Sequence, residues 1–131
     1  MTEQEIRTIL NRQREYFATG ATLSRKFRAE QLGKLKASLQ RHEEELNAAL
    51  QQDLGKSRME SYMCEIGLTL SELTWMQKHL RGLMQEKRVP TPLSQFAAIS
   101  FRSPSPYGTV LIMSPWNYPV LLTLDPLIDA I

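Results

Sequence analysis

Apolar residues recur at helical spacing through the first part of the chain. Thr2 and Glu5 form a capping-box pattern, which predicts a helix start there. Gly20 interrupts this helix, a second amphipathic segment follows, and a third runs from acidic residues, which suit a helix N-terminus, to Gly55. The apolar positions of these three predicted helices are Ile6, Ile9, Leu10 and Phe17; Phe27, Leu32, Leu35 and Leu39; and Leu46, Ala49, Leu50 and Leu54.

The longest apolar pattern runs from residue 57 to about residue 85. Ser57 and Glu60 form a second capping-box pattern at its start. A helix of this length would be on the order of 40 Å long at 1.5 Å per residue. Its apolar face is wider than a coiled-coil seam, so we expect it to pack within its own domain rather than on a partner helix. The face comprises Met59, Met63, Ile66, Leu70, Leu73, Leu80 and Met84.

The last third of the chain has a different pattern. Residues 97–102 are typical of a strand, and residues 109–113 are apolar without alternation, as in a strand buried on both faces of a parallel sheet. Pro119 fits the first turn of a helix, in which Asp125 and Pro126 predict a kink. A buried parallel strand needs parallel neighbours, and only one such strand is predicted. We therefore expect the N-terminal part of a larger α/β protein.

Composition and charge narrow the possible functions. Hydrophobic residues at 42% and charged residues at 23% are typical of a soluble globular protein, and no apolar run approaches a membrane span of about 20 residues. The single cysteine cannot form an internal disulfide, and the N-terminus is unlike a secretory signal, so we expect a cytoplasmic protein. Residues 1–41 hold nine Lys and Arg against four Glu, but no aromatic residues alternate with them, so we expect no nucleic-acid partner.

Asn117 is the residue to which chemistry is most readily assigned. Its amide offers two N–H donors and does not titrate, which suits a site where negative charge develops on a substrate oxygen. Asn is also favoured as a helix cap, so the spacing alone leaves both roles open. Cys64 lies within the long predicted helix with no His nearby in sequence, which favours a structural role. His42 and His79 lack metal-ligand spacing, so we predict no metal site.

Five short motifs carry a resemblance to a known family. They are Asp53-Leu54-Gly55-Lys56, Glu65-Ile66-Gly67, Lys87-Arg88-Val89-Pro90-Thr91-Pro92, Pro106-Tyr107-Gly108 and Pro115-Trp116-Asn117-Tyr118-Pro119. In their order and spacing the chain resembles the aldehyde dehydrogenase superfamily over nearly its whole length. It is most similar to the class 3-like branch of fatty and aromatic aldehyde dehydrogenases.

The resemblance implies an α/β fold in which N-terminal helices lead into the first strands of a Rossmann-like NAD(P)-binding domain. Residues 1–95 would form the helical segment, residues 96–106 the strand region of an oligomerisation arm, and residues 107–131 the start of the cofactor-binding domain. A homo-oligomer, with a dimer favoured, is implied as well.

The implied activity is the oxidation of an aldehyde substrate to a carboxylic acid with NAD or NADP, through a cysteine thiohemiacetal. Asn117 matches the oxyanion-hole asparagine of the family. The catalytic cysteine, the glutamate base and the glycine-rich cofactor loop would all follow residue 131, so this segment alone is predicted to be inactive. The residues that would line the cofactor site, mostly through their backbone, are Ile112, Met113, Ser114, Pro115 and Trp116.

A second hypothesis remains open on the sequence. The chain could be a short, non-catalytic interaction module whose long helix, residues 57–85, offers the partner surface. A cooperatively folded, monodisperse protein of 131 residues would favour this hypothesis, whereas aggregation of the isolated chain would favour the first.

Overall fold

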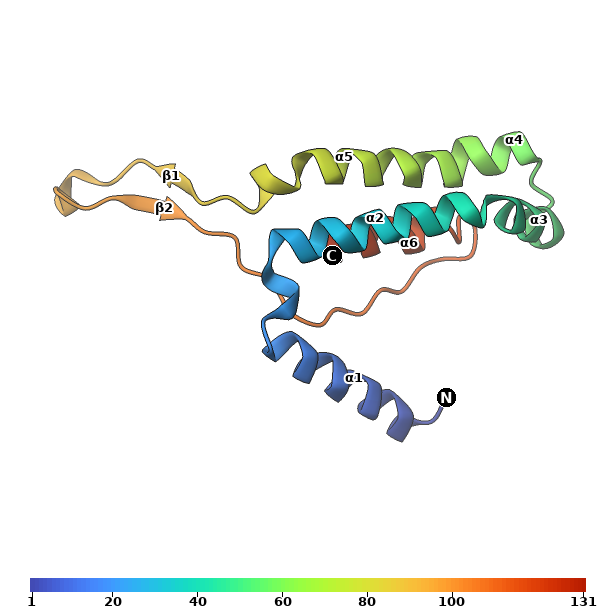
Figure 1. Cartoon of the computed structure of the whole chain (residues 1–131), viewed down its shortest axis with the longest axis horizontal. Helices are drawn as coiled ribbons and strands as arrows, with labels where there is room; N and C mark the ends of the chain where they lie inside the picture. Colours follow the sequence, from blue (N-terminus) through green and yellow to red (C-terminus); the bar gives the residue numbers. More distant parts are fainter.

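Helices make up most of the structure, which a computed structural model describes for all 131 residues (Figure 1). Two short strands, β1 (Lys87–Val89) and β2 (Ser100–Arg102), form the only sheet. The helical elements in chain order are α1 (Glu3–Ala18), η1 (Ala21–Leu23), α2 (Arg25–Arg41), α3 (Glu43–Leu54), α4 (Arg58–Ser61), η2 (Tyr62–Ile66), α5 (Gly67–Leu83), η3 (Leu93–Gln95) and α6 (Leu121–Ala130). The fold is therefore mixed and dominated by helices.

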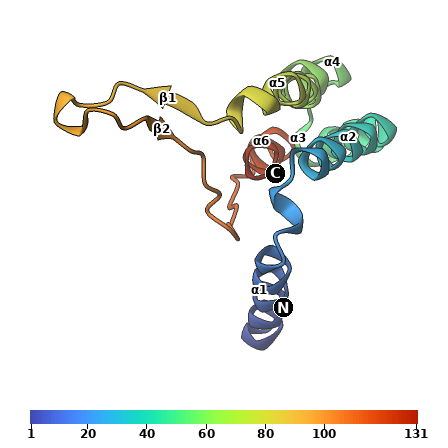
Figure 2. The same ribbon diagram turned by 60° about the vertical axis from the view of Figure 1, so that its left-hand side comes forward.

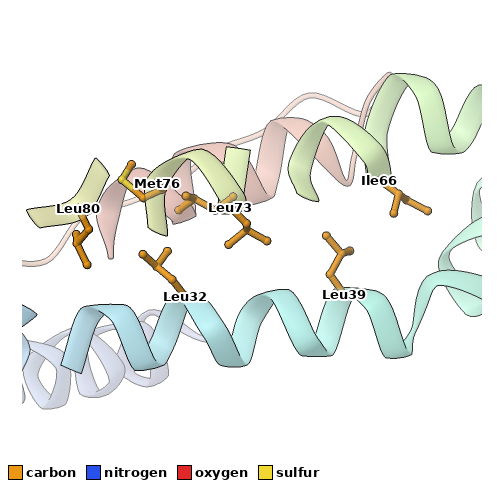
Figure 3. Packing of buried hydrophobic residues seen from close by; sticks show 7 residues of the cluster. Leu32, Leu39, Ile66, Leu73, Met76 and Leu80 are labelled. Carbon is orange, nitrogen blue, oxygen red and sulfur yellow. The ribbon is translucent and has the colours of Figure 1, made fainter. Parts of the chain in front are cut away.

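The hydrophobic core lies between α2, α5 and α6, which Figure 2 shows nearly end-on. Side chains from α2 and from the η2–α5 helix point toward one another across this interface (Figure 3). The helical periodicity of the sequence predicted most of these positions, because residues three or four apart share a helix face. The buried cluster consists of Leu32, Leu39, Ile66, Leu73, Met76, Leu80 and Ile128.

The three predicted N-terminal helices are confirmed, although α1 extends away from the core and buries no residue (Figures 1 and 2). The predicted capping box is present: the Thr2 hydroxyl accepts from the Glu5 N–H, and the Glu5 carboxylate accepts from the Thr2 N–H. Gly55 ends α3 with a left-handed φ of 66°, a conformation in which a side chain would be strained.

The predicted long helix is also present, but it contains a π-helical turn. The helix continues from α4 through η2 into α5, and the Gly67 N–H donates to the carbonyl of Tyr62, five residues earlier. This wider turn shifts the buried face. Ser61 is fully buried five residues before Ile66, whereas Met59, predicted to be apolar core, is 71% exposed. The prediction of the apolar face is therefore wrong before the π turn.

The two predicted strands have different outcomes. Of residues 97–102, only the last three are in a strand, paired antiparallel with β1, because Ala97 adopts a left-handed φ of 78° that breaks the extended backbone. Residues 109–113 form no strand, and the exposed fractions of Leu111 and Met113 are 81% and 85%. The predicted strand is therefore absent from this structure, and no second strand lies beside the run to pair with it.

Candidate functional site

The candidate site is the turn of residues 114–120, hereafter the site turn, which leads into α6. The Leu122 N–H donates to the Tyr118 carbonyl at 3.0 Å, so helical bonding begins before the formal start of α6. Pro119 consequently lies in the first turn, as predicted, where its missing N–H leaves no bond unmade. The helix then continues through Pro126 to Ala130.

Asn117 lies on the exposed surface of the site turn, and its side-chain amide makes no hydrogen bond. Helix α6 has no side-chain cap from its own N-terminal residues, so the structure does not assign the capping role to this asparagine. Only its backbone carbonyl is bound, by the Lys56 ammonium at 2.9 Å. The main hollows of the surface are lined by other residues. The side-chain amide of Asn117 therefore has no hydrogen-bond partner within the chain and is exposed to solvent.

A buried ion pair lies directly behind the site turn. The Lys56 ammonium is 2.5 Å from Oε1 of Glu65, and Glu65 is completely buried. The other carboxylate oxygen, Oε2, accepts from the N–H groups of Val120 and Leu121 at 2.8 and 3.4 Å. A carboxylate at a helix N-terminus is favourable because unpaired N–H groups and the positive end of the helix dipole meet there. Glu65 thus caps α6 from another part of the chain.

Lys56 completes the cluster with a contact to an aromatic ring. Its ammonium lies 4.0 Å from the centroid of the Tyr118 ring, a cation–π distance. Sequence reasoning included Lys56 and Glu65 in motifs but gave neither a role. The sequence did contain a signal for Glu65. It lies four residues before Thr69 and eight before Leu73, which places it on the same helix face as these two fully buried residues. A charged residue on a buried helix face needs a partner, and here the partner is Lys56.

The predicted cofactor-lining residues, 112–116, run into the first part of the site turn, and their backbone groups are unpaired. The backbone N–H and C=O groups of residues 109–116 form no hydrogen bond within the chain. Met113 and Trp116 are 85% and 89% exposed, and the Ser114 hydroxyl lies 2.6 Å from that of Thr123. Unpaired backbone donors and acceptors fit a role in holding a polar cofactor, and they equally fit pairing with a neighbouring strand.

The other residues considered for chemistry lie away from the site turn or are paired locally. Cys64 is a partly buried free thiol in η2. Nδ1 of His42 lies 3.2 Å from the Glu45 carboxylate, and the ring of His79 stacks on Trp75 at a centroid distance of 4.3 Å. No three His, Cys, Asp or Glu residues are grouped as metal ligands. None of the helices has the combined length and apolar composition that a membrane crossing requires.

Asp125, one turn into α6, has a carboxyl whose ionisation is perturbed by its surroundings. Burial raises the pKa of its carboxyl, and the negative charges of Glu72 and Asp129 raise it further. Its Oδ1 is buried without a hydrogen-bond partner. The carboxylate is therefore a local source of instability rather than part of the paired network at the start of the helix.

Comparison with known proteins identifies relatives over almost the whole chain. The 4,4'-diaponeurosporen-aldehyde dehydrogenase of Staphylococcus aureus is 43% identical over 116 residues, which are 88% of this chain and 25% of that protein. Aldehyde dehydrogenase family 3 member B1 of Homo sapiens is 43% identical over 122 residues, 93% of this chain and 26% of that protein. The chain thus spans about a quarter of the length of these relatives.

The fold is shared as well as the sequence. A solved structure described as the substrate-bound state of Staphylococcus aureus AldH superimposes with a TM-score of 0.93 and 40% sequence identity, covering 95% of this chain and 27% of that one. The family described as the Aldehyde dehydrogenase family matches residues 1–131. With the fold and the sequence in agreement, the chain belongs to the aldehyde dehydrogenase family.

Proposed function

We propose that the chain is the N-terminal part of an NAD(P)-dependent aldehyde dehydrogenase that oxidises aldehydes to carboxylic acids. The nucleophilic cysteine and the glutamate base would lie outside these 131 residues, so the segment by itself would be inactive. A cytoplasmic homodimer is the assembly we propose. The observation that carries the proposal is the free amide of Asn117 on a turn whose backbone is bound to buried charged residues, in a chain of this family.

Asn117 would act as a hydrogen-bond donor to the substrate. When a thiolate adds to an aldehyde carbonyl, the oxygen gains negative charge, and a fixed N–H donor stabilises that charge more than it stabilises the neutral carbonyl. An amide is suited to this role because it keeps its donors at every working pH. The side chain has no competing partner within the chain, so both N–H groups remain available.

Residues 112–116 would hold part of the cofactor. Their free backbone groups are the feature that fits this role, and the partner would be a nicotinamide dinucleotide. When bound, such a cofactor would supply a hydride acceptor for the oxidation of the aldehyde. This segment would contribute only binding and orientation, and we propose that either NAD or NADP serves as the oxidant.

The test requires a complete enzyme. A chimera in which residues 1–131 replace the corresponding segment of the Staphylococcus aureus relative supplies one, since the two are 43% identical there. In this chimera, Asn117→Ala should lower kcat by roughly 10²–10³-fold, as for other oxyanion donors, while KM changes little. The measurement is steady-state reduction of NAD or NADP with an aldehyde substrate.

Asn11→Ala is the matched control, because Asn11 is an exposed asparagine on α1, remote from the site turn. It should leave kcat unchanged. A chimera that folds but oxidises no aldehyde would contradict the proposed function. An active chimera in which Asn117→Ala has the kcat of the parent would contradict the role of the amide alone.

A further inference from the structure

We propose that Lys56 and Glu65 are positioning residues that fix the site turn and thereby orient the amide of Asn117. The catalytic part of this inference rests on the proposed function of Asn117. The structural part, that the pair holds the turn, stands on the contacts alone. Neither residue would touch the substrate, because Glu65 is completely buried and Lys56 is nearly so.

The polar contacts of the pair converge on the site turn. Lys56 donates to the Asn117 carbonyl at 2.9 Å, and Glu65 accepts from Val120 at 2.8 Å. The 2.5 Å ion pair joins the two holding points into one unit. The backbone is therefore bound to these buried charges at Asn117 itself and again three residues later at Val120, which limits how far the amide can move.

Stability alone is a weak reason for such a pair. Desolvating two charges costs several kcal/mol per ion, and well-packed apolar residues of similar size often stabilise a protein as well or better. The pair gives a defined geometry that apolar packing would not give, because hydrogen bonds are directional. Helix α6 has no cap from its own residues, so without Glu65 the N–H groups of Val120 and Leu121 would lose their partner.

Position matters for a donor such as Asn117 because transition-state stabilisation depends on geometry. A displacement of about 1 Å by a change remote from the chemistry can lower the rate by about 10²-fold. The Asn117 side chain makes no hydrogen bond that would correct such a displacement. We therefore expect loss of the Lys56 bond to lower kcat with little change in KM.

The first test measures the turn itself, in the chimera defined above. Lys56→Met removes the ammonium and keeps most of the aliphatic stem. It should speed amide hydrogen exchange at Val120 and Leu121, whose N–H groups bond to Glu65, measured by mass spectrometry or NMR. Lys36→Met is the matched control, because Lys36 is a partly buried lysine that bonds Thr74 on another helix at 2.8 Å and does not contact the turn. Unchanged exchange in Lys56→Met would overturn the proposal whether or not the chimera is active.

The second test is kinetic and separates positioning from general destabilisation. If Lys56 acts through Asn117, Lys56→Met should lower kcat by about 10²-fold in the parent chimera and by less than about twofold in the Asn117→Ala background. Lys56→Arg, which retains donors and charge, should partly restore kcat. Equal losses in both backgrounds would overturn the positioning role, since a purely structural effect does not depend on Asn117.

A lone buried carboxylate could unfold the single variant, so a second variant removes both charges. In Lys56→Met/Glu65→Gln the glutamine oxygen can still accept from Val120, whereas the Asn117 carbonyl loses its donor. The Tm of this double variant should be close to that of the parent chimera. Its kcat should still be lowered in the parent chimera but not in the Asn117→Ala background. A folded double variant with parental kcat would overturn the proposal, and the kcat of Asn117→Ala alone reports separately on the proposed function.

Discussion

The carboxylates of Glu65, which bonds to the start of α6, and of Asp125, which lies within α6, have opposite surroundings. Glu65 is buried, but each of its oxygens has a partner, in the Lys56 ammonium and in the first N–H groups of the helix. Asp125 is only partly buried, yet its Oδ1 has no partner and two further carboxylates lie near it. Both oxygens of the buried Glu65 are thus paired, whereas Asp125 keeps an unpaired oxygen, and a missing hydrogen bond adds to the cost of burying a polar group.

Asp125 leads to a prediction about pH. The pKa of its carboxyl is raised in the folded chain, so the folded state binds the proton more tightly than the unfolded state. Its contribution to stability is then fully present below the ordinary value of 3.8 and is lost as the pH rises through the raised pKa. Asp125→Asn, which is neutral throughout, should raise the Tm of the chimera at pH 7, and the gain should shrink toward pH 4.

Thermal unfolding across this pH range measures the effect. Asp53→Asn, which removes an exposed carboxylate at the end of α3, is the control and should not reproduce it. A gain that is independent of pH would show that Asp125 acts through packing and not through its charge.

At the scale of elements, the π turn η2 sets which face of the long helix is buried. Ser61, Ile66 and Leu73 are all fully buried; the first two are five positions apart and the last two are seven positions apart. An ordinary helix repeats every 3.6 residues, so a pattern read forward from residue 57 selects Met59 and Met63, both of which are exposed. The sequence predicted the helix and its length. It did not predict the π turn at Tyr62–Ile66, because the extra residue in that turn depends on tertiary contacts that hydrophobic periodicity does not describe.

Gly67 gives a prediction for this element. A Cβ at this position would lie 2.7 Å from the carbonyl oxygen of Tyr62, which is backbone and cannot move without changing the π turn. Gly67→Ala should therefore lower the Tm of the chimera, and it should also lower kcat, because a shifted π turn displaces Glu65 from α6.

Gly82→Ala is the matched control within the same helix. A Cβ there meets nothing within 4 Å, so alanine should stabilise the helix by up to about 1 kcal/mol through its better helix propensity. Differential scanning fluorimetry compares the two variants. Equal shifts of Tm would contradict the prediction that the close contact between a Cβ at position 67 and the Tyr62 carbonyl destabilises the protein.

At the scale of the whole molecule, the chain leaves many large apolar side chains exposed. Only 13 of 131 residues are buried, and α1, the β1–β2 hairpin and residues 109–113 all carry exposed large apolar side chains. Soluble monomers rarely expose large contiguous apolar patches. The apolar run of 109–113 suggested a strand, but strand formation needs a neighbour, and the chain contains none beside it. For the same reason, the surroundings of Asn117 could not be predicted from these residues alone.

This exposure predicts how the isolated chain behaves in solution. The 131-residue protein should bind a hydrophobic dye such as ANS strongly and aggregate as its concentration rises, whereas the chimera should do neither. Leu111→Ser, at a position 81% exposed, should lower dye binding by the isolated chain without lowering its Tm. The same change should destabilise the chimera, because there we expect the run to be a buried strand. A monodisperse chain with low dye binding would favour the interaction-module hypothesis instead.

Glu65 caps α6 from a position 55 residues before Val120, so the order of the site turn depends on a distant part of the chain. The turn cannot become ordered through local bonds alone, since Glu65 reaches it only when the η2–α5 helix has docked and Lys56 comes from the segment between α3 and α4. By thermodynamic linkage, whatever binds the ordered turn must also stabilise that docked helix. In the chimera, saturation with the proposed aldehyde substrate or cofactor should therefore slow proteolysis of the α3–α5 region, which lies far along the chain from the site turn.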